Sequence, residues 1–578
     1  MQGIKAFLPI LDWAPGYGRR EFADDSLAAV IVMIMLIPQS LAYAMLAGLP
    51  PEVGLYASIV PLMVYTFFGS SRTLSVGPVA VLSLMTAAAL GRLDLPSVEA
   101  YVTAAMTLAL MSGLILLLLG FLRLGFLANF LSHPVIAGFI TASALIIALS
   151  QLQHVFGVSA HGENLLVLLP SLVASIGESL SNFNWPTLLI GVGVMLYLLW
   201  ARRHLARILM RAGLPERLAI ILSRVSPIVA VAVTILLAWA LDLGEAGVSL
   251  TGEVPAGLPG LTRPDFSLEI WLALLGSAAL IAIIGFVESV SVAQGLAAKR
   301  RQRIDPNQEL IGLGSANIAG SFTGGFPVTG GFARSVVNFD AGAATPAAGF
   351  YVAVLIAAAT FFLMPLLAFL PRATLAATII VAVWALVDFS IVRKAWDYSR
   401  ADFLAVLSTI VITLLAGVEY GVASGILVSI LVHLYKTSRP HVAIVGEVPG
   451  TEHFRNIKRH EVVTHEEILS LRVDESLYFA NTRYLEDLIY REVSARPNLR
   501  HVILMCSAVN EIDLSALESL ETLNRRLLEM EIRLHLSEVK GPVMDALEGT
   551  HLPAELSGRI FLSQHQAVSE LLAEENAA

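Results

Sequence analysis

The sequence predicts an α-helical membrane protein that continues into a smaller α/β domain at its C-terminal end. Of its 578 residues, 56% are hydrophobic and only 14% are charged, whereas a soluble protein carries about a quarter charged residues. The charges are unevenly placed, because long apolar runs dominate up to about Tyr435 and ordinary charge density returns beyond Pro440. This break predicts the boundary between a membrane domain and a soluble domain.

Composition also excludes several classes of function. The net charge of -9 argues against a nucleic-acid partner. Cys506 is the only cysteine, so an intrachain disulfide is impossible and a cysteine-based metal site is not expected. The chain has no GxxxxGK[ST] loop for ATP, and no nucleophile–base pair or metal cluster, so we expect neither an enzyme nor a cofactor. The N-terminal segment lacks a signal-peptide cleavage pattern and is expected to be retained.

The apolar part predicts 14 spans, since a bilayer core takes about 20 apolar residues as helix and fewer where a span is broken. An even number places both termini on one side of the membrane. The segments are 26–47, 52–68, 75–91, 101–121, 127–151, 186–202, 225–243, 270–297, 308–320, 327–340, 346–368, 373–389, 401–416 and 420–436.

The placement of lysine and arginine tests this count. If the N-terminus is cytoplasmic, 20 of these residues fall in inside segments and only Arg92, Arg263 and Arg372 fall outside. Such a bias is the positive-inside pattern, and a count that was wrong by one span would have mixed the two sets. We therefore expect both the N-terminus and the tail domain to be cytoplasmic.

These patterns divide the chain into four parts. A cytoplasmic N-terminal segment (1–25) precedes the membrane domain (26–437), which is followed by a linker (438–460) and a cytoplasmic domain (461–578). In the last part short apolar strands such as ILSLRVDES and VILMCSAVN alternate with amphipathic helices such as LEDLIYREVS. This alternation is typical of an α/β domain.

Two of the spans are broken. The third opens with RTLSVGPVAVLSLM and the tenth with SFTGGFPVTGGFARSVV. In each, an extended stretch (Thr73–Val76 and Phe326–Thr329) leads through Gly or Pro into a helix too short to cross alone. Irregular backbone at membrane depth is tolerated only where it is buried in protein or lines a cavity. Matching breaks in the third span of each seven indicate an inverted-repeat transporter with its substrate at the midplane.

The breaks also predict the sign of the substrate. Helix N-termini that meet at the midplane present unpaired N–H groups and positive dipole ends, which favour an anion. Arg334 follows the second break, and a guanidinium can bind an oxyanion through two parallel hydrogen bonds. The alternatives are an arginine that reaches the interface or one paired with Asp340.

Glu288 is a lone carboxylate within an apolar span, in IAIIGFVESVSVAQ. Such a group can take up and release a proton, which makes it the candidate for proton coupling. It could instead be a fixed counter-ion for Arg334 or a hydrogen-bonded structural acid. Asp388 and Glu419 lie near span ends and are interpreted as interfacial.

Several long motifs carry a family resemblance. PQSLAYAMLAGLPPEVGLYAS (38–58), SVGPVAVLS (75–83), SHPVIAGF (132–139), the run 305–338 and LPRATLAATII (370–380) resemble, in order, the motifs of the sulfate permease (SulP) family of anion transporters. The resemblance covers nearly the whole chain. It implies two intertwined seven-span inverted repeats, a core and a gate domain, an elevator-like movement of the core, and a homodimer.

The resemblance also implies a substrate site. Gln39 and Tyr43 are four residues apart, so they share a helix face, and both can donate hydrogen bonds to an oxyanion. For Tyr43 alone, core packing is the alternative. Carried over residue by residue, the site comprises Gln39, Tyr43, Gly77, Pro78, Val79, Ala80, Glu288, Ala333 and Arg334.

The sequence departs from the family pattern at two places. Many relatives have serine at the position of Ala333, so one hydroxyl donor is missing. Sodium-coupled bicarbonate members have aspartate at the position of Glu288 and a hydroxyl residue one turn later, where this chain has Val292, which cannot ligate sodium. Glutamate here resembles the proton-coupled sulfate and dicarboxylate members, so we expect proton symport.

The tail segment VILMCSAVNEIDLSALESL resembles the STAS domain, which these transporters share with bacterial anti-sigma-factor antagonists. In the antagonists this motif carries a phosphorylatable serine, and Ser515 falls at its place, although Ala516 replaces the following glycine. Ser515 is therefore a candidate regulatory residue. Alternatively, Asp513 or Ser515 simply caps the next helix.

The sequence thus predicts a secondary active transporter of a small oxyanion in a lipid bilayer, preferably sulfate, by proton symport. FPVTGGFARSVVNFDAGAATPAAG looks most like bacterial sulfate members, which implies a bacterial inner membrane. Bicarbonate and C4-dicarboxylates remain alternative substrates. An anion sensor that signals through the STAS domain and an uncoupled anion channel remain alternative functions.

Overall fold

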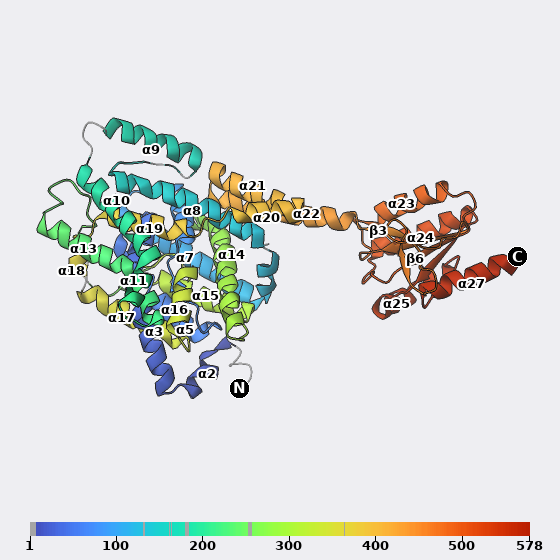
Figure 1. Cartoon of the computed structure of the whole chain (residues 1–578), viewed down its shortest axis with the longest axis horizontal. Helices are drawn as coiled ribbons and strands as arrows, with labels where there is room; N and C mark the ends of the chain where they lie inside the picture. Colours follow the sequence, from blue (N-terminus) through green and yellow to red (C-terminus); the bar gives the residue numbers. More distant parts are fainter. Residues whose placement is uncertain are drawn as a thin grey trace. The chain divides into compact units, whose positions relative to one another are not determined.

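The structure is a computed structural model that describes residues 7–130, 133–160, 162, 164–179, 184–252, 257–362 and 364–577. Its chain divides into two compact units, Met1–Ser429 and Ile430–Ala578. Figure 1 follows the chain from the N-terminal helices through the first unit to the C-terminal helix α27.

The described part of the first unit consists of helices and two short strands, β1 (Val76–Gly77) and β2 (Thr329–Gly330). Its first helices are α2 (Ile10–Trp13), α3 (Arg19–Leu46), α4 (Pro51–Tyr56), α5 (Val60–Phe68), α6 (Ala80–Gly91), α7 (Val98–Phe121), α8 (His133–Phe156), α9 (Leu165–Ser179), α10 (Trp185–Trp200), α11 (Ala206–Arg211), α12 (Glu216–Arg224) and α13 (Ser226–Ala240). The second half holds α14 (Leu268–Lys299), α15 (Pro306–Ser321), α16 (Phe332–Ala341), α17 (Ala347–Phe362), α18 (Met364–Leu367), α19 (Arg372–Trp384), α20 (Ser390–Tyr398), α21 (Arg400–Ala416) and α22 (Val418–Ser438).

Each segment that the sequence predicts to span the membrane overlaps a helix or a pair of helices. Among the described residues, 7 helices are long and apolar enough, by length and composition, to cross a bilayer. Others, such as α13, α17 and α19, are shorter apolar helices. The predicted α-helical, multi-pass fold is confirmed, while the number of 14 spans stays a prediction.

Contacts between helices divide the first unit into two bundles. The first bundle contains α3–α7 and α14–α17, and the second contains α8, α10, α13, α19 and α21. Each bundle takes helices from both halves of the chain, so the two halves are intertwined. This arrangement agrees with the core and gate domains that the family resemblance implies.

Small residues allow the helices of the first bundle to approach closely. α7 and α15 meet at Gly113 and Gly314, where a Cβ on either glycine would lie 2.9 Å from the carbonyl oxygen of the other. Small residues at a membrane helix crossing permit this backbone contact and its dense van der Waals packing. The two helices therefore form a tightly packed crossing in the bundle that carries both broken spans.

The second unit contains a six-stranded sheet in the order β4-β3-β5-β6-β7-β8. Its strands are β3 (Val442–Glu447), β4 (Phe454–Asn456), β5 (Ile468–Val473), β6 (His501–Met505), β7 (Arg533–Ser537) and β8 (Ile560–Phe561). β5 to β8 run parallel, and β3 pairs antiparallel with both β4 and β5. The helices are α23 (Thr482–Ser494), α24 (Leu514–Glu529), α25 (Gly541–Glu548), α26 (Leu552–Glu555) and α27 (Gln564–Ala577).

The expected linker at 438–460 differs from the structure, because it contains β3 and β4. Val442 pairs with Val473 on β5, and Ala443 and Val445 are only 2% exposed. These two residues belong to a hydrophobic cluster with Phe454 of β4. The alternation of buried and half-buried residues in VAIVGE is a strand pattern, and the sheet of the tail domain therefore begins before residue 461.

Candidate functional site

The two broken spans meet through their extended stretches. β1 and β2 pair antiparallel, with Val76 opposite Gly330 and Gly77 opposite Thr329. α6 begins at Ala80, shortly after β1, and α16 begins at Phe332, shortly after β2. The strand pair therefore brings the N-termini of the two half-helices together, as the sequence predicts.

Both half-helices begin without a side-chain cap. Val79 precedes α6 and Gly331 precedes α16, and neither position provides a side-chain hydrogen bond. The first N–H groups of a helix have no partner within the helix and need one from outside. Two uncapped helix starts, side by side, form an arrangement that suits an anion.

Arg334 joins the two breaks to each other. Its side chain is 2% exposed. Nε donates to the Ser75 carbonyl at 2.7 Å, Nη1 to the Pro78 carbonyl at 2.7 Å, and Nη2 to the carbonyls of Gly77 at 2.6 Å and Thr329 at 2.7 Å. A guanidinium has five N–H bonds, so four of them are used by backbone oxygens.

This geometry differs from the expected bidentate pairing of Arg334 with an oxyanion. The guanidinium group of Arg334 faces the carbonyl oxygens of the extended stretches. Most of its N–H donors are therefore occupied, and what remains for the site is mainly its positive charge. Close approach explains the glycine at position 77, since a Cβ there would lie 3.0 Å from Nη1 of Arg334.

Further side chains hold the extended stretches in place. The side chain of Asn317 on α15 forms two hydrogen bonds with the backbone of Val328. It donates to the Val328 carbonyl at 2.9 Å and accepts from the Val328 N–H at 2.8 Å. The Ser335 hydroxyl accepts from the Ser75 N–H at 3.0 Å, and the Asn338 amide donates to the Thr73 carbonyl at 3.1 Å. Side chains thus satisfy backbone groups that a broken helix leaves unpaired.

Gln39 and Tyr43 lie on α3, and both are partly buried. Within the described part of the chain, neither side chain forms a hydrogen bond. Tyr43, Glu288 and Arg334 lie close enough to interact electrostatically. The structure therefore places these candidates from three helices in one region.

The remaining candidates surround the helix starts. Gly77, Pro78, Val79 and Ala80 are buried along β1 and the start of α6, and Ala333 is exposed in the first turn of α16. Their side chains contribute no polar group. They can act only through their backbone and through the space that their small size leaves.

Glu288 of α14 borders a small cavity of about 20 Å³, which is about the size of one water. The cavity is lined by Val135, Ile136, Phe139 and Ile140 of α8, by Ile284, Val287 and Glu288 of α14, and by Val422 of α22. Among the described residues, Glu288 has no hydrogen-bond or ion-pair partner. It is therefore neither ion-paired with Arg334 nor hydrogen-bonded as a structural acid in this conformation.

No group of three or more His, Cys, Asp or Glu residues that could hold a metal ion occurs in the described part of the chain. Val292, one turn after Glu288, is 8% exposed and offers no oxygen.

Three buried carboxylates form contacts that were not predicted from the sequence. Glu309 of α15 accepts from Tyr65 and from the backbone at Ser71, and Asp25 accepts from Thr345. Glu419, interpreted as interfacial, is 7% exposed and pairs with Arg92 at 2.6 Å and with Ser277 at 2.9 Å. Sequence spacing could not find these contacts, because each partner lies far away along the chain.

In the tail domain, Asp513 caps α24. Its Oδ1 accepts from the Ala516 N–H at 2.8 Å, and its Oδ2 accepts from the Phe479 N–H at 2.9 Å. Ser515 is exposed in the first turn of the helix. The cap belongs to Asp513, and Ser515 stays a candidate for modification.

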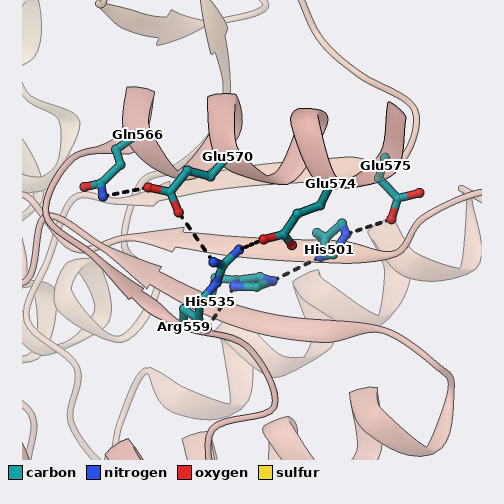
Figure 2. A network of polar contacts seen from close by, with 7 residues as sticks. All are labelled: His501, His535, Arg559, Gln566, Glu570, Glu574 and Glu575. Carbon is teal, nitrogen blue, oxygen red and sulfur yellow. Dashed lines mark hydrogen bonds and ion pairs between the residues drawn. The ribbon is translucent and has the colours of Figure 1, made fainter. Parts of the chain in front are cut away.

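The tail domain also holds a polar network between the sheet and α27 (Figure 2). His501 Nδ1 lies 3.1 Å from His535 Nε2, and His501 Nε2 lies 3.1 Å from Glu575. Arg559 binds Glu574 at 2.6 Å. The network, which Figure 2 extends to Gln566 and Glu570, fastens α27 to the sheet.

The hydrogen bonds fix the tautomers of the histidine pair. The Arg559 backbone N–H donates to His535 Nδ1 at 3.0 Å, so His535 carries its proton on Nε2 and donates it to His501 Nδ1. His501 then donates from Nε2 to Glu575. Burial, together with the smaller effects of His501, Arg559 and Arg533, lowers the pKa of His535 to about 3. His535 is therefore held neutral.

Two family models match the chain: the sulfate permease family over residues 22–409 and the STAS domain over residues 459–567. Among curated proteins, the chain is 37% identical to the probable sulfate transporter 4.2 of Arabidopsis thaliana, covering 98% of this chain and 83% of the relative. It is 31% identical to the high affinity sulfate transporter 2 of Stylosanthes hamata, covering 98% of this chain and 86% of the relative.

Solved structures share the fold. The murine solute carrier 26 family member A9 anion transporter, in the inward-facing state, matches with a TM-score of 0.90 and 24% identity, covering 99% of this chain and 95% of that chain. The transmembrane domain of a cyanobacterial bicarbonate transporter, BicA, matches with a TM-score of 0.60 and 21% identity, covering 70% of this chain and 98% of that chain.

Proposed function

Because the chain belongs to the sulfate permease family and carries a STAS domain, we propose that it is a proton-coupled transporter of a small oxyanion, with sulfate as the preferred substrate. Members of this family are transporters and not enzymes. The observation that carries the proposal is the pair of uncapped helix starts, held together by β1 and β2 beside the charge of Arg334.

The anion is bound, in this proposal, mainly by backbone N–H groups at the starts of α6 and α16. These groups and the two helix dipoles favour negative charge. Gln39 and Tyr43 supply side-chain donors, and the small residues at 77–80 and 333 leave space for the anion. Arg334 contributes its charge at short range, since the buried guanidinium keeps no carboxylate partner within hydrogen-bond distance in the described structure.

Sulfate is preferred because the similar curated proteins are named sulfate transporters. Bicarbonate is the second candidate, since the membrane domain resembles that of BicA in fold and Ala333 lacks a hydroxyl group for a larger oxyanion.

Glu288 is the proposed proton carrier. A carboxyl group beside an apolar cavity, with no fixed partner, can exchange a proton when the cavity opens. The cavity lies between α14 of the first bundle and α8 of the second. An elevator-like movement of the first bundle against the second would change the access of Glu288 to water, and so link the proton to transport.

The proposal includes a cell-membrane location with the tail domain in the cytoplasm, a bacterial inner membrane as the membrane concerned, and a homodimer as the assembly. The bias of lysine and arginine supports the orientation. The location and the dimer rest on the resemblance to the family.

The test is uptake of labelled sulfate by purified protein in liposomes, with and without an inward proton gradient. We expect the gradient to stimulate uptake, and Glu288→Gln to remove the stimulation because the amide cannot carry the proton. Glu419→Gln is the matched control, since Glu419 is also a buried membrane carboxylate but is ion-paired. Equal stimulation in Glu288→Gln would exclude the proposed carrier. Uptake of bicarbonate instead of sulfate would replace the substrate and keep the site.

A further inference from the structure

A chain of three hydrogen bonds joins α14 to β2 directly beside Glu288. The next residue, Ser289, accepts from the Gly330 N–H at 2.8 Å, and its Oγ lies 2.6 Å from Oγ1 of Thr329. The Thr329 hydroxyl in turn donates to the Gly285 carbonyl at 2.5 Å. Gly285 and Ser289 lie on consecutive turns of α14, so the hydrogen-bonded chain begins at Gly330 of β2 and ends at Gly285 of that helix.

The direction of each hydrogen bond follows from the number of protons. Thr329 has one hydroxyl proton and gives it to the Gly285 carbonyl, which can only accept. Ser289 must therefore donate its own proton to Thr329, while its oxygen accepts from the Gly330 N–H. Each hydroxyl group is thus used once as donor and once as acceptor, with no spare proton.

Both side chains are enclosed by protein. Ser289 is 0% exposed and Thr329 is 1% exposed, and a buried hydroxyl group that lost its partner would cost free energy. The hydrogen bonds of these two hydroxyl groups therefore have one stable arrangement, which fixes α14 against β2. Because β2 pairs with β1, the helix that carries Glu288 is tied to the strands that lead into both half-helices.

We propose that Ser289 and Thr329 are positioning residues that couple Glu288 to the anion site. This inference rests on the function proposed above. A proton on Glu288 changes the charge beside α14, and the hydroxyl chain makes α14 and the paired strands move as one body. Without the chain, α14 can shift while the strands keep their place, so that anion binding and protonation become independent.

Thr329→Val is the sharpest variant, because valine has nearly the same shape and lacks only the hydroxyl. In this variant the Ser289 hydroxyl can turn to the Gly285 carbonyl of its own helix, four residues earlier, as buried serines in helices do. Because this rotation moves the Ser289 oxygen away, α14 then loses its hydrogen bonds to both Thr329 and Gly330. Thr329→Ser keeps the hydroxyl and serves as the rescue variant.

The first measurement is sulfate uptake by the full-length protein in liposomes across external pH, with and without an inward proton gradient. We expect Thr329→Val to keep uptake at high sulfate but to lower the ratio of gradient-driven to gradient-free uptake by about tenfold, the change that loss of one buried hydrogen bond can produce. Thr329→Ser should retain the ratio of the parent. An unchanged ratio and pH profile in Thr329→Val would overturn the coupling role.

The second measurement does not depend on transport. Hydrogen exchange of a peptide covering 326–331 should be faster in Thr329→Val than in the parent and in Thr329→Ser, because the Gly330 N–H loses its acceptor. If the parent transports no anion but this difference is found, the proposed function fails and the tie between α14 and β2 stands. Equal exchange in all three proteins would overturn the tie itself.

If Thr329→Val does not fold, Ser289→Ala takes its place in both measurements. This variant removes the same acceptor and keeps the Thr329 bond to Gly285.

Discussion

At the scale of single residues, Arg334 is a buried charge that holds the two extended stretches together and that we propose as part of the anion site. Its side chain binds four carbonyl oxygens from two stretches that are more than 250 positions apart in the sequence. Residue type and the position after a break were enough to select Arg334 as a site candidate. The direction of its donors could not be predicted, since it depends on carbonyl groups from the other half of the chain.

We predict that Arg334→Lys loses sulfate uptake almost as completely as Arg334→Ala. Lysine keeps the charge but cannot reach four carbonyls with a fixed fork, and hydrogen bonds to a charged group contribute about 1.5–3 kcal/mol each. The check is uptake together with the apparent melting temperature in detergent. Arg202→Lys is the control, because Arg202 is exposed and donates to one carbonyl, that of Val381. Full uptake in Arg334→Lys would show that charge alone is needed.

A second residue-scale prediction concerns His535 in the tail domain. Its pKa is about 3 in the folded protein and about 6.5 in an unfolded chain, so the unfolded state binds a proton that the folded state excludes. This stabilisation is complete above about pH 6.5 and is lost as pH falls, by up to about 1.4 kcal/mol per pH unit.

Thermal unfolding of the tail domain within the full-length protein, followed from pH 7 to pH 5, checks this prediction. We expect His535→Gln to start from a lower stability and to show a weaker dependence on pH. His453→Gln, at an exposed position, should behave like the parent. The same slope in the His535 variant and in the parent would assign the pH dependence to other groups.

At the scale of elements, the half-helices depend on the helices around them. α6 and α16 are short, and the extended stretch before α16 is held by α14 through Ser289 and by α15 through Asn317. α15 is in turn packed closely against α7. The Gly and Pro residues of the breaks predicted where the helices would be interrupted, but the pairing of β1 with β2 required both halves of the fold.

We predict that Gly314→Ala destabilises the membrane domain by about 1–3 kcal/mol, the usual range for overpacking. The new Cβ would lie 2.9 Å from the Gly113 carbonyl and would force α7 and α15 apart. Gly193→Ala on α10 is the matched control, since nothing lies within 4 Å of a Cβ there. Thermal unfolding in detergent measures both variants, and equal melting temperatures would contradict the role of this crossing.

At the scale of the whole molecule, the chain consists of two units that differ in polarity. The first unit buries polar side chains among apolar helices, and the second is an α/β domain with ordinary charge density. The compact second unit begins at Ile430, and its sheet begins at Val442 rather than near the predicted boundary at 461.

The boundary leads to a prediction about fragments of the chain. A fragment of residues 440–578 should fold as a soluble domain, whereas a fragment of residues 461–578 should aggregate. The shorter fragment lacks β3 and β4, which leaves the edge of β5 unpaired and uncovers Ile468. Soluble yield and gel filtration of the two fragments test this. Equal behaviour would restore 438–460 as a linker.

The class of the fold could be predicted from the sequence, because hydrophobic length, charge placement and strand alternation are local properties of the chain. Family motifs and breaks also selected Gln39, Tyr43, Glu288 and Arg334. The structure places Tyr43, Glu288 and Arg334 in one region, and Gln39 lies one turn before Tyr43 on α3. The orientation and the contacts of these groups depend on the tertiary structure. The four carbonyls around Arg334, the cavity beside Glu288 and the hydroxyl chain through Ser289 each join residues that are distant in sequence, and such contacts exist only once the two halves of the chain have packed together.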